Sequence, residues 1–140
     1  MLRVLLVEDN AADARLAVEA LRECTVPTHV ALVNDGLQAL SYLRREGQYA
    51  GAVLPDVLLL DLNLPKMDGR KVLVEIKSDH ILKHIPVIIF TSSEAEHEVL
   101  LAYLHGASGY LVKPHALESY FSLLQECITF WGTQVRLPVR

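Results

Sequence analysis

Short apolar runs alternate with amphipathic stretches along the whole chain. Five of these runs are short and rich in Val, Ile and Leu, which is typical of strands buried in a sheet. The predicted strands cover residues 2–7, 29–33, 57–60, 86–90 and 110–112. Val57–Leu60 contains no polar residue, so we expect both of its faces to be buried.

The stretches between these strands place apolar residues near helical spacing. The predicted helices cover residues 11–22, 37–45, 69–78, 94–105 and 117–131. Asn10 is a suitable N-cap for the first of them. The order is therefore a strand followed by a helix, five times over. This order predicts an α/β fold, a parallel sheet between two layers of helices.

Length and composition agree with one domain of this kind. The chain has 140 residues, 51% of them hydrophobic, and after the last helix only the tail 132–140 remains, so no second domain is expected. The net charge is −4 and no basic run exceeds Arg44-Arg45, which argues against a nucleic-acid partner. No apolar stretch suits a signal peptide or a membrane span, and two cysteines do not suggest a disulfide scaffold. We therefore expect a cytoplasmic protein with no membrane partner.

Charged and hydroxyl residues follow four of the predicted strands. Glu8 and Asp9 follow the first strand, Asp61 the third, Thr91 the fourth and Lys113 the fifth. Taken singly, each could be a helix cap or a solvated charge. The carboxyl ends of parallel strands share one edge of a sheet, however, so these residues should lie together. Three carboxylates there would repel one another unless a hard cation such as Mg²⁺ were bound, and a lysine and a hydroxyl beside them suit a phosphoryl group.

Four sequence segments carry this pattern, and together they resemble the receiver domain of two-component response regulators. They are VEDN at 7–10, LLLDLNLPKMDG at 58–69, FTSS at 90–93 and GYLVKP at 109–114. The resemblance covers nearly the whole chain and implies a flavodoxin-like (βα)5 three-layer sandwich with strand order 2-1-3-4-5 and a receiver domain over residues 1–131. Two positions depart from the family pattern: Glu8 replaces the commoner Asp, and His115 replaces the usual Phe or Tyr.

The resemblance also implies a role for each residue of the predicted site. Asp61 would be the phosphoacceptor, receiving the phosphoryl group from a histidine kinase. The implied Mg²⁺ ligands are Glu8, Asp9, Asp61 and the backbone carbonyl of Asn63. Lys113 and Thr91 would contact the phosphoryl group, Thr91 and Tyr110 would form a conformational switch, and the peptide bond between Lys113 and Pro114 would be cis.

Two further segments resemble small stand-alone receivers that serve phytochrome-type kinases. They are DGLQALSYLRREGQY at 35–49 and FWGTQVRLP at 130–138. This subfamily implies a homodimer through the fourth helix, the fifth strand and the last helix, with the tail assisting. The last helix should turn inward a stripe of Leu117, Tyr120, Phe121, Leu124, Cys127, Ile128 and Trp131. Candidate interface residues are Val99, Tyr103, Leu123, Phe130 and Trp131. The alternative is that the tail covers the excess apolar surface within one monomer.

The sequence thus predicts a single-domain response regulator whose output passes through protein contacts. It would not be an enzyme beyond its own phosphoryl transfer and slow autodephosphorylation. A degenerate receiver that only binds partners is the main alternative. An aspartyl phosphatase would need a second acid where Asn63 stands, and a flavin binder would need a hydroxyl-rich loop where EDNAAD stands at 8–13.

Overall fold

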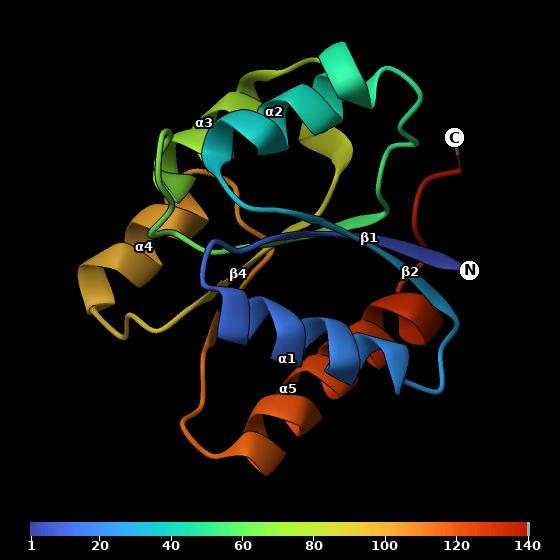
Figure 1. Ribbon diagram of the computed structural model, residues 1–140. Helices are drawn as coiled ribbons and strands as arrows, with labels where there is room; N and C mark the ends of the chain where they lie inside the picture. Colours follow the sequence, from blue (N-terminus) through green and yellow to red (C-terminus); the bar gives the residue numbers. More distant parts are fainter. Residues whose placement is uncertain (140) are drawn as a thin grey trace.

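Five parallel strands form one sheet in the computed structural model, which describes residues 1–139 (Figure 1). The strands are β1 (Leu2–Val7), β2 (Thr28–Val33), β3 (Val57–Leu60), β4 (Val87–Thr91) and β5 (Gly109–Val112). Their order across the sheet is β2-β1-β3-β4-β5, which confirms the predicted fold class. Arg140, the last residue of the predicted tail, lies outside the described residues.

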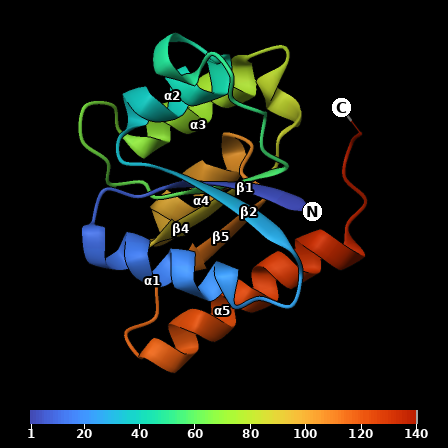
Figure 2. The same cartoon turned by 45° about the vertical axis from the view of Figure 1, so that its right-hand side comes forward.

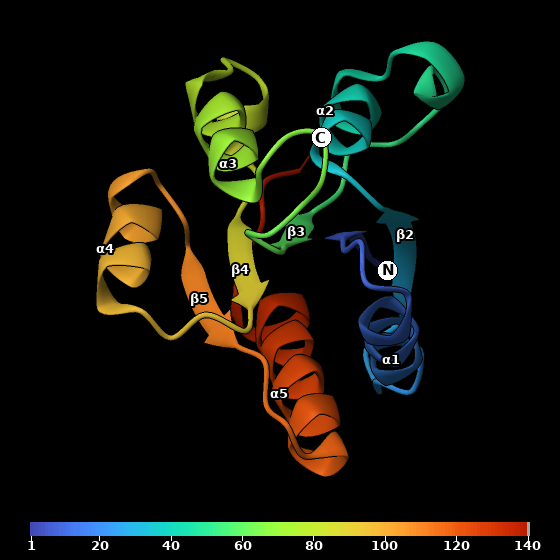
Figure 3. The same cartoon turned by 60° about the vertical axis from the view of Figure 1, so that its left-hand side comes forward.

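Helices cover both faces of the sheet. They are α1 (Ala11–Arg22), α2 (Gly36–Arg44), α3 (Gly69–Ser78), α4 (Glu96–Leu104) and α5 (Leu117–Thr129). Helices α1 and α5 lie on one face, and α2, α3 and α4 on the other, as the turned views make clear (Figures 2 and 3). Every predicted boundary falls within two residues of the observed one. Within residues 1–139, no helix combines the length and the apolarity that a membrane span requires.

The core is divided between the two faces because side chains alternate along each strand. All four residues of β3 are fully buried: Leu58 and Leu60 join the cluster under α2, α3 and α4, while Val57 and Leu59 join the cluster under α1 and α5. This confirms that the strand is buried on both sides. A strand so enclosed can carry polar side chains that reach solvent only at its two ends, and Asp61 follows its carboxyl end.

Helix α5 packs through a stripe of residues spaced four apart. Tyr120, Leu124 and Ile128 are buried, and Phe121, Cys127 and Trp131 are partly buried against the same cluster. The prediction that Leu117 belongs to this stripe is wrong, because its side chain is 57% exposed. Leu117 is the first residue of α5, next to the carboxyl ends of the strands, so the sheet offers it no apolar surface to cover.

The tail returns along the opposite end of the sheet. After α5 the chain makes a π-helical turn, Phe130–Gln134. It then passes near the start of β1, so that the N-terminus and the described part of the tail lie far from the carboxyl ends of the strands (Figure 1). Leu137 packs against the α1 and α5 side of the core. Helix α4 gains no cover from the tail, and Leu100, Leu101, Tyr103 and Leu104 remain exposed on it. The alternative in which the tail hides this apolar surface therefore fails for α4.

Gly69 allows α3 to begin directly against the loop that follows β3. A Cβ atom built on Gly69 would lie 2.1 Å from the carbonyl oxygen of Asp61, whereas one on Gly51 would meet nothing within 4 Å. We predict that Gly69→Ala lowers the free energy of unfolding by about 2 kcal/mol or more, because backbone must move to admit the methyl group. Gly51→Ala should change it by less than about 0.5 kcal/mol. Urea denaturation of both variants checks this, and equal midpoints would contradict the packing described.

Candidate functional site

Strand pairing brings the predicted site residues to one edge of the sheet, called here the carboxyl edge. Strands β1 and β3 pair in register, so Glu8 and Asp61 leave them side by side, and the amide of Asp61 donates to the carbonyl of Val7 at 3.2 Å. Strands β4 and β5 pair likewise, and the amide of Lys113 donates to the carbonyl of Thr91 at 2.8 Å. Residues as many as 105 positions apart in sequence thus become neighbours.

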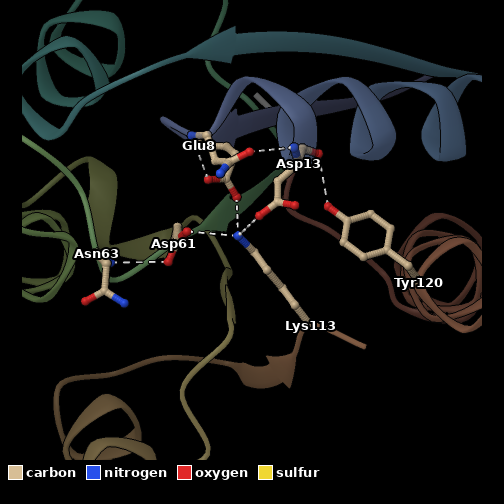
Figure 4. Close-up of polar contacts among 7 residues, drawn as sticks. Glu8, Asp13, Asp61, Asn63, Lys113 and Tyr120 are labelled. Atoms are coloured by element: carbon tan, nitrogen blue, oxygen red, sulfur yellow. Dashed lines mark hydrogen bonds and ion pairs between the residues drawn. The ribbon is translucent and has the colours of Figure 1, made fainter. Parts of the chain in front are cut away.

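The ammonium group of Lys113 is bonded to three carboxylates (Figure 4). Its Nζ lies 2.5 Å from Glu8 Oε1, 2.9 Å from Asp13 Oδ2 and 3.0 Å from Asp61 Oδ2. Burial by itself lowers the pKa of a lysine, but the three carboxylates more than offset this, and the pKa of Lys113 is raised above its ordinary value. Lys113 therefore remains a cation throughout the physiological pH range.

The two carboxylates deepest in the site are Glu8 and Asp61, both buried. Burial raises the pKa of Glu8 to about 7, although the hydrogen bond and charge of Lys113 lower it. The second oxygen of Glu8 accepts the Asn10 amide at 3.2 Å. Asp61 accepts the Asn63 amide at 3.2 Å through Oδ1 and the Lys113 ammonium through Oδ2, so both of its oxygens are oriented.

Three acidic side chains at the carboxyl edge are close enough to share a metal ion. Glu8, Asp9 and Asp61 each offer a carboxylate oxygen, and these oxygens lie within 4.8 Å of one another. Among residues 1–139, no other group of three His, Cys, Asp or Glu side chains meets this condition. Glu8 and Asp61 are buried, and Asp9 is exposed. Carboxylate oxygens suit hard divalent cations, so the donor set fits the predicted metal.

Thr91 places a hydroxyl group at the same edge without a partner. The residue is fully buried, and its Oγ1 has no hydrogen bond within the described part of the chain. A buried hydroxyl left unpaired costs about 1–3 kcal/mol, and few such groups persist in folded proteins without a reason. The hydroxyl of Thr91 is therefore available to a hydrogen-bonding group that enters the site.

Tyr110 connects β5 to the loop that follows β4. Its hydroxyl donates to the carbonyl of Ser93 at 3.0 Å, and its partly buried ring packs against the core under α2, α3 and α4. Tyr110 therefore holds the loop that begins after Thr91. The two predicted switch residues are linked through Ser93, which follows Thr91 in the chain and accepts the hydrogen bond from Tyr110.

A second link joins the segment after Asp61 to α4. The guanidinium of Arg70, in the first turn of α3, pairs with Asp68 and with Glu98 in the first turn of α4. Hydrogen bonds from Ser93 and Arg70 lower the pKa of the Glu98 carboxyl. The start of α4 is therefore tied to the helix that follows the loop carrying Asp61.

Two features of the site differ from the sequence analysis. Asp13 was not predicted: its position in the first turn of a helix is typical of an acid that simply opposes the helix dipole, and only the fold brings it to Lys113. The predicted cis peptide before Pro114 is wrong, since residues 1–139 contain no cis peptide bond. The side chain of Lys113 reaches all three carboxylates from a trans peptide.

Comparison with known proteins identifies the class to which this site belongs. Residues 4–125 match the family model of the response regulator receiver domain. The chain therefore belongs to this family, which confirms the predicted resemblance.

Particular relatives refine the comparison. The chain is 42% identical over 135 residues to response regulator Rcp1 of Synechocystis sp. (strain ATCC 27184 / PCC 6803 / Kazusa), which covers 96% of this chain and 92% of Rcp1. The crystal structure of the Mn(2+)-bound form of Rcp1 matches with a TM-score of 0.94 at 41% identity, covering 99% of this chain and 100% of the other. The phosphorylated cyanobacterial phytochrome response regulator RcpA matches with a TM-score of 0.94 at 47% identity, covering 98% of each chain.

The raised pKa of Glu8 predicts a pH dependence of stability in the absence of divalent metal. The pKa is about 7 in the folded chain against an ordinary value of 4.5, so between these values the folded state binds more protons than the unfolded state. The contribution of Glu8 to stability is then lost as the pH rises through about 7, by at most about 3 kcal/mol.

Glu8→Gln has no proton to lose and serves as the reference for this effect. We predict that the free energy of unfolding of the wild type, minus that of Glu8→Gln, falls between pH 5 and pH 8. Urea denaturation in the presence of a chelator measures both. A difference that stays constant, or rises with pH, would show that burial does not penalise the ionised form of Glu8.

Proposed function

We propose that this chain is a single-domain response regulator that accepts a phosphoryl group on Asp61 from a histidine kinase of the phytochrome type. The observation that carries the proposal is the arrangement at the carboxyl edge. There the oriented carboxylate of Asp61 lies beside a buried ammonium group, an acidic metal-binding group and the unpartnered hydroxyl of Thr91. The likeness to RcpA and Rcp1 over the full chain supports the type of kinase.

Mg²⁺ is the proposed cofactor, with Glu8, Asp9, Asp61 and the backbone carbonyl of Asn63 as its ligands. The three carboxylates supply the hard oxygens that Mg²⁺ prefers, and the Mn(2+)-bound form of the relative Rcp1 supports a divalent cation in this class of site. When bound, the cation offsets the negative charge of the carboxylates and of the incoming phosphoryl group.

Residues of the chain itself carry out the phosphoryl transfer. A carboxylate oxygen of Asp61 attacks the phosphorus of a phosphohistidine, the new O–P bond forms, and the P–N bond breaks with its electron pair passing to the imidazole, which takes up a proton. Lys113 turns its ammonium group toward the phosphoryl oxygens, and the hydroxyl of Thr91 donates to one of them. Later attack by water returns Asp61 slowly to the free carboxylate.

Output would follow from the position of Thr91 at the end of β4. Movement of Thr91 toward a phosphoryl group displaces the loop that Tyr110 holds through Ser93, and the linked start of α4 moves with it. The receiver domain of residues 1–131 would pass this change to other proteins by direct contact, in the cytoplasm and without a nucleic-acid or membrane partner.

A homodimer through α4, β5 and α5 is the proposed assembly. Exposed apolar side chains gather on α4, and Phe130, which directly follows α5, is 54% exposed. The proposed interface residues are Val99, Tyr103, Leu123, Phe130 and Trp131. Two of them, Leu123 and Trp131, also pack partly against the core of their own chain, so the interface would extend the core rather than add a separate patch.

Asp61→Asn should abolish phosphoryl uptake, because an amide nitrogen or oxygen cannot form the acyl phosphate. Intact mass after incubation with acetyl phosphate and Mg²⁺ should show one added phosphate in the wild type and none in the variant. Asp68→Asn is the matched control, since Asp68 lies in the same loop, is exposed and caps α3, as Asn also can. Uptake by Asp61→Asn would refute the assignment. A wild type that accepts phosphate neither from acetyl phosphate nor from a phosphorylated phytochrome-type kinase would favour a receiver that only binds partners.

Tyr103→Glu should shift the chain from dimer to monomer, because a charge would be buried in an apolar interface. Sedimentation velocity at several protein concentrations measures this. Ile81→Glu is the matched control, since Ile81 is 65% exposed but lies between α3 and β4, outside the proposed interface. A wild type that is monomeric throughout, or a Tyr103→Glu variant as dimeric as the wild type, would refute the interface.

A further inference from the structure

Asp13 is the one partner of Lys113 that the proposed function leaves without a role. Its Oδ2 lies 2.9 Å from Lys113 Nζ, as close as a strong charge-assisted hydrogen bond. It is not part of the group formed by Glu8, Asp9 and Asp61 that could bind metal. Asp13 therefore touches the site through the lysine alone.

The main chain of Asp13 is fixed from two directions. Its amide donates to the side chain of Asn10 at 3.0 Å, which is the N-cap bond of α1. Its carbonyl accepts the hydroxyl of Tyr120 at 3.0 Å, from the neighbouring helix α5 (Figure 4). Tyr120 is itself buried, with its ring edge-on to Phe90 at 5.3 Å between centroids. The main chain that carries the Asp13 carboxylate is therefore held rigidly.

Two of the three carboxylates that bind Lys113 are also candidate metal ligands, and the third is not. An ammonium group has three N–H donors, and here Glu8, Asp13 and Asp61 use all of them. Glu8 and Asp61 are also two of the three acids in the metal-binding group, so a cation and the ammonium group draw on the same carboxylates. Asp13 alone can hold the ammonium group without taking an oxygen from the cation.

We infer that Asp13 is a positioning residue, which holds the Lys113 ammonium beside Asp61 while Glu8 and Asp61 bind the divalent cation. The inference rests on the proposed function and adds a residue to it. Without Asp13, the ammonium group relies on Glu8 and Asp61 alone and competes with the cation for them. Lys113 also loses the hydrogen bond to Asp13 that would keep its ammonium group in the site when a phosphoryl group enters.

Titration with Mg²⁺ alone, followed by calorimetry, tests the inference on the full chain. Asp13→Ala should weaken Mg²⁺ binding roughly tenfold, as loss of a residue that orients the ligands typically does. Asp13→Asn keeps an oxygen acceptor for Lys113 and should stay within about threefold of the wild type, on the same scale. Glu19→Ala removes the same charge from an exposed position of α1 and should leave Mg²⁺ binding unchanged.

A double-mutant cycle with Lys113→Ala shows whether Asp13→Ala weakens Mg²⁺ binding through Lys113 or by disturbing the fold. If Asp13 acts through Lys113, then Asp13→Ala should cause no further change in Mg²⁺ affinity once Lys113 is removed. An equal loss in both backgrounds, or an Asp13→Ala variant that binds Mg²⁺ like the wild type, would overturn the inference. Loss of binding in Asp13→Asn as large as in Asp13→Ala would also overturn it, because the retained acceptor should suffice.

Phosphoryl uptake distinguishes this inference from the proposed function. At saturating Mg²⁺, Asp13→Ala should take up phosphate from acetyl phosphate roughly tenfold more slowly than the wild type, as expected for the loss of one hydrogen bond to a charged group. If uptake depends on Asp61 but not on Asp13, the inference fails and the proposed function stands. If the wild type takes up no phosphate, the proposed function fails, and the Mg²⁺ titrations alone decide the role of Asp13.

Discussion

The structure depends on how one ammonium group neutralises several carboxylates at the end of a buried sheet. Glu8 and Asp61 are buried with Lys113 between them, and Asp13 completes its set of partners. Taking a carboxylate out of water is costly unless a cation compensates it. One lysine cannot fully compensate four acids, counting Asp9, and burial raises the pKa of Glu8 even though the hydrogen bond and charge of Lys113 lower it. The site is therefore built to gain positive charge, which a divalent cation can provide.

The rest of the fold holds these charges in place. Parallel pairing puts Glu8 level with Asp61 and puts Lys113 next to Thr91, and the fully buried β3 fixes the point at which Asp61 emerges. Gly69 lets α3 start against the backbone of Asp61 itself, so the segment around the acid cannot drift. In the proposed reaction, a carboxylate held this way would meet an incoming phosphoryl group in one orientation, which would lower the entropic cost of the reaction.

Much of this could be predicted from the sequence, because the deciding signals are local. The apolar run Val57–Leu60 and the helical spacing between strands define the elements, and alternation of strand and helix defines a parallel sheet, whose edge gathers the acids. The wrong or missing predictions concern features that do not depend on neighbouring residues in the sequence. Leu117 has the apolar character of a core residue, but the sheet ends before it, and Asp13 meets Lys113 only because α1 and β5 finish at the same edge.

The most direct test of the central claim is to locate the acyl phosphate in the unmodified wild-type chain. Borohydride reduces an aspartyl phosphate to homoserine, so reduction after incubation with acetyl phosphate and Mg²⁺ marks the acceptor for peptide mapping by mass spectrometry. The account predicts homoserine at position 61 only, and none when a chelator is present during the incubation. Homoserine at Asp9 or Asp13, or at position 61 regardless of Mg²⁺, would contradict it.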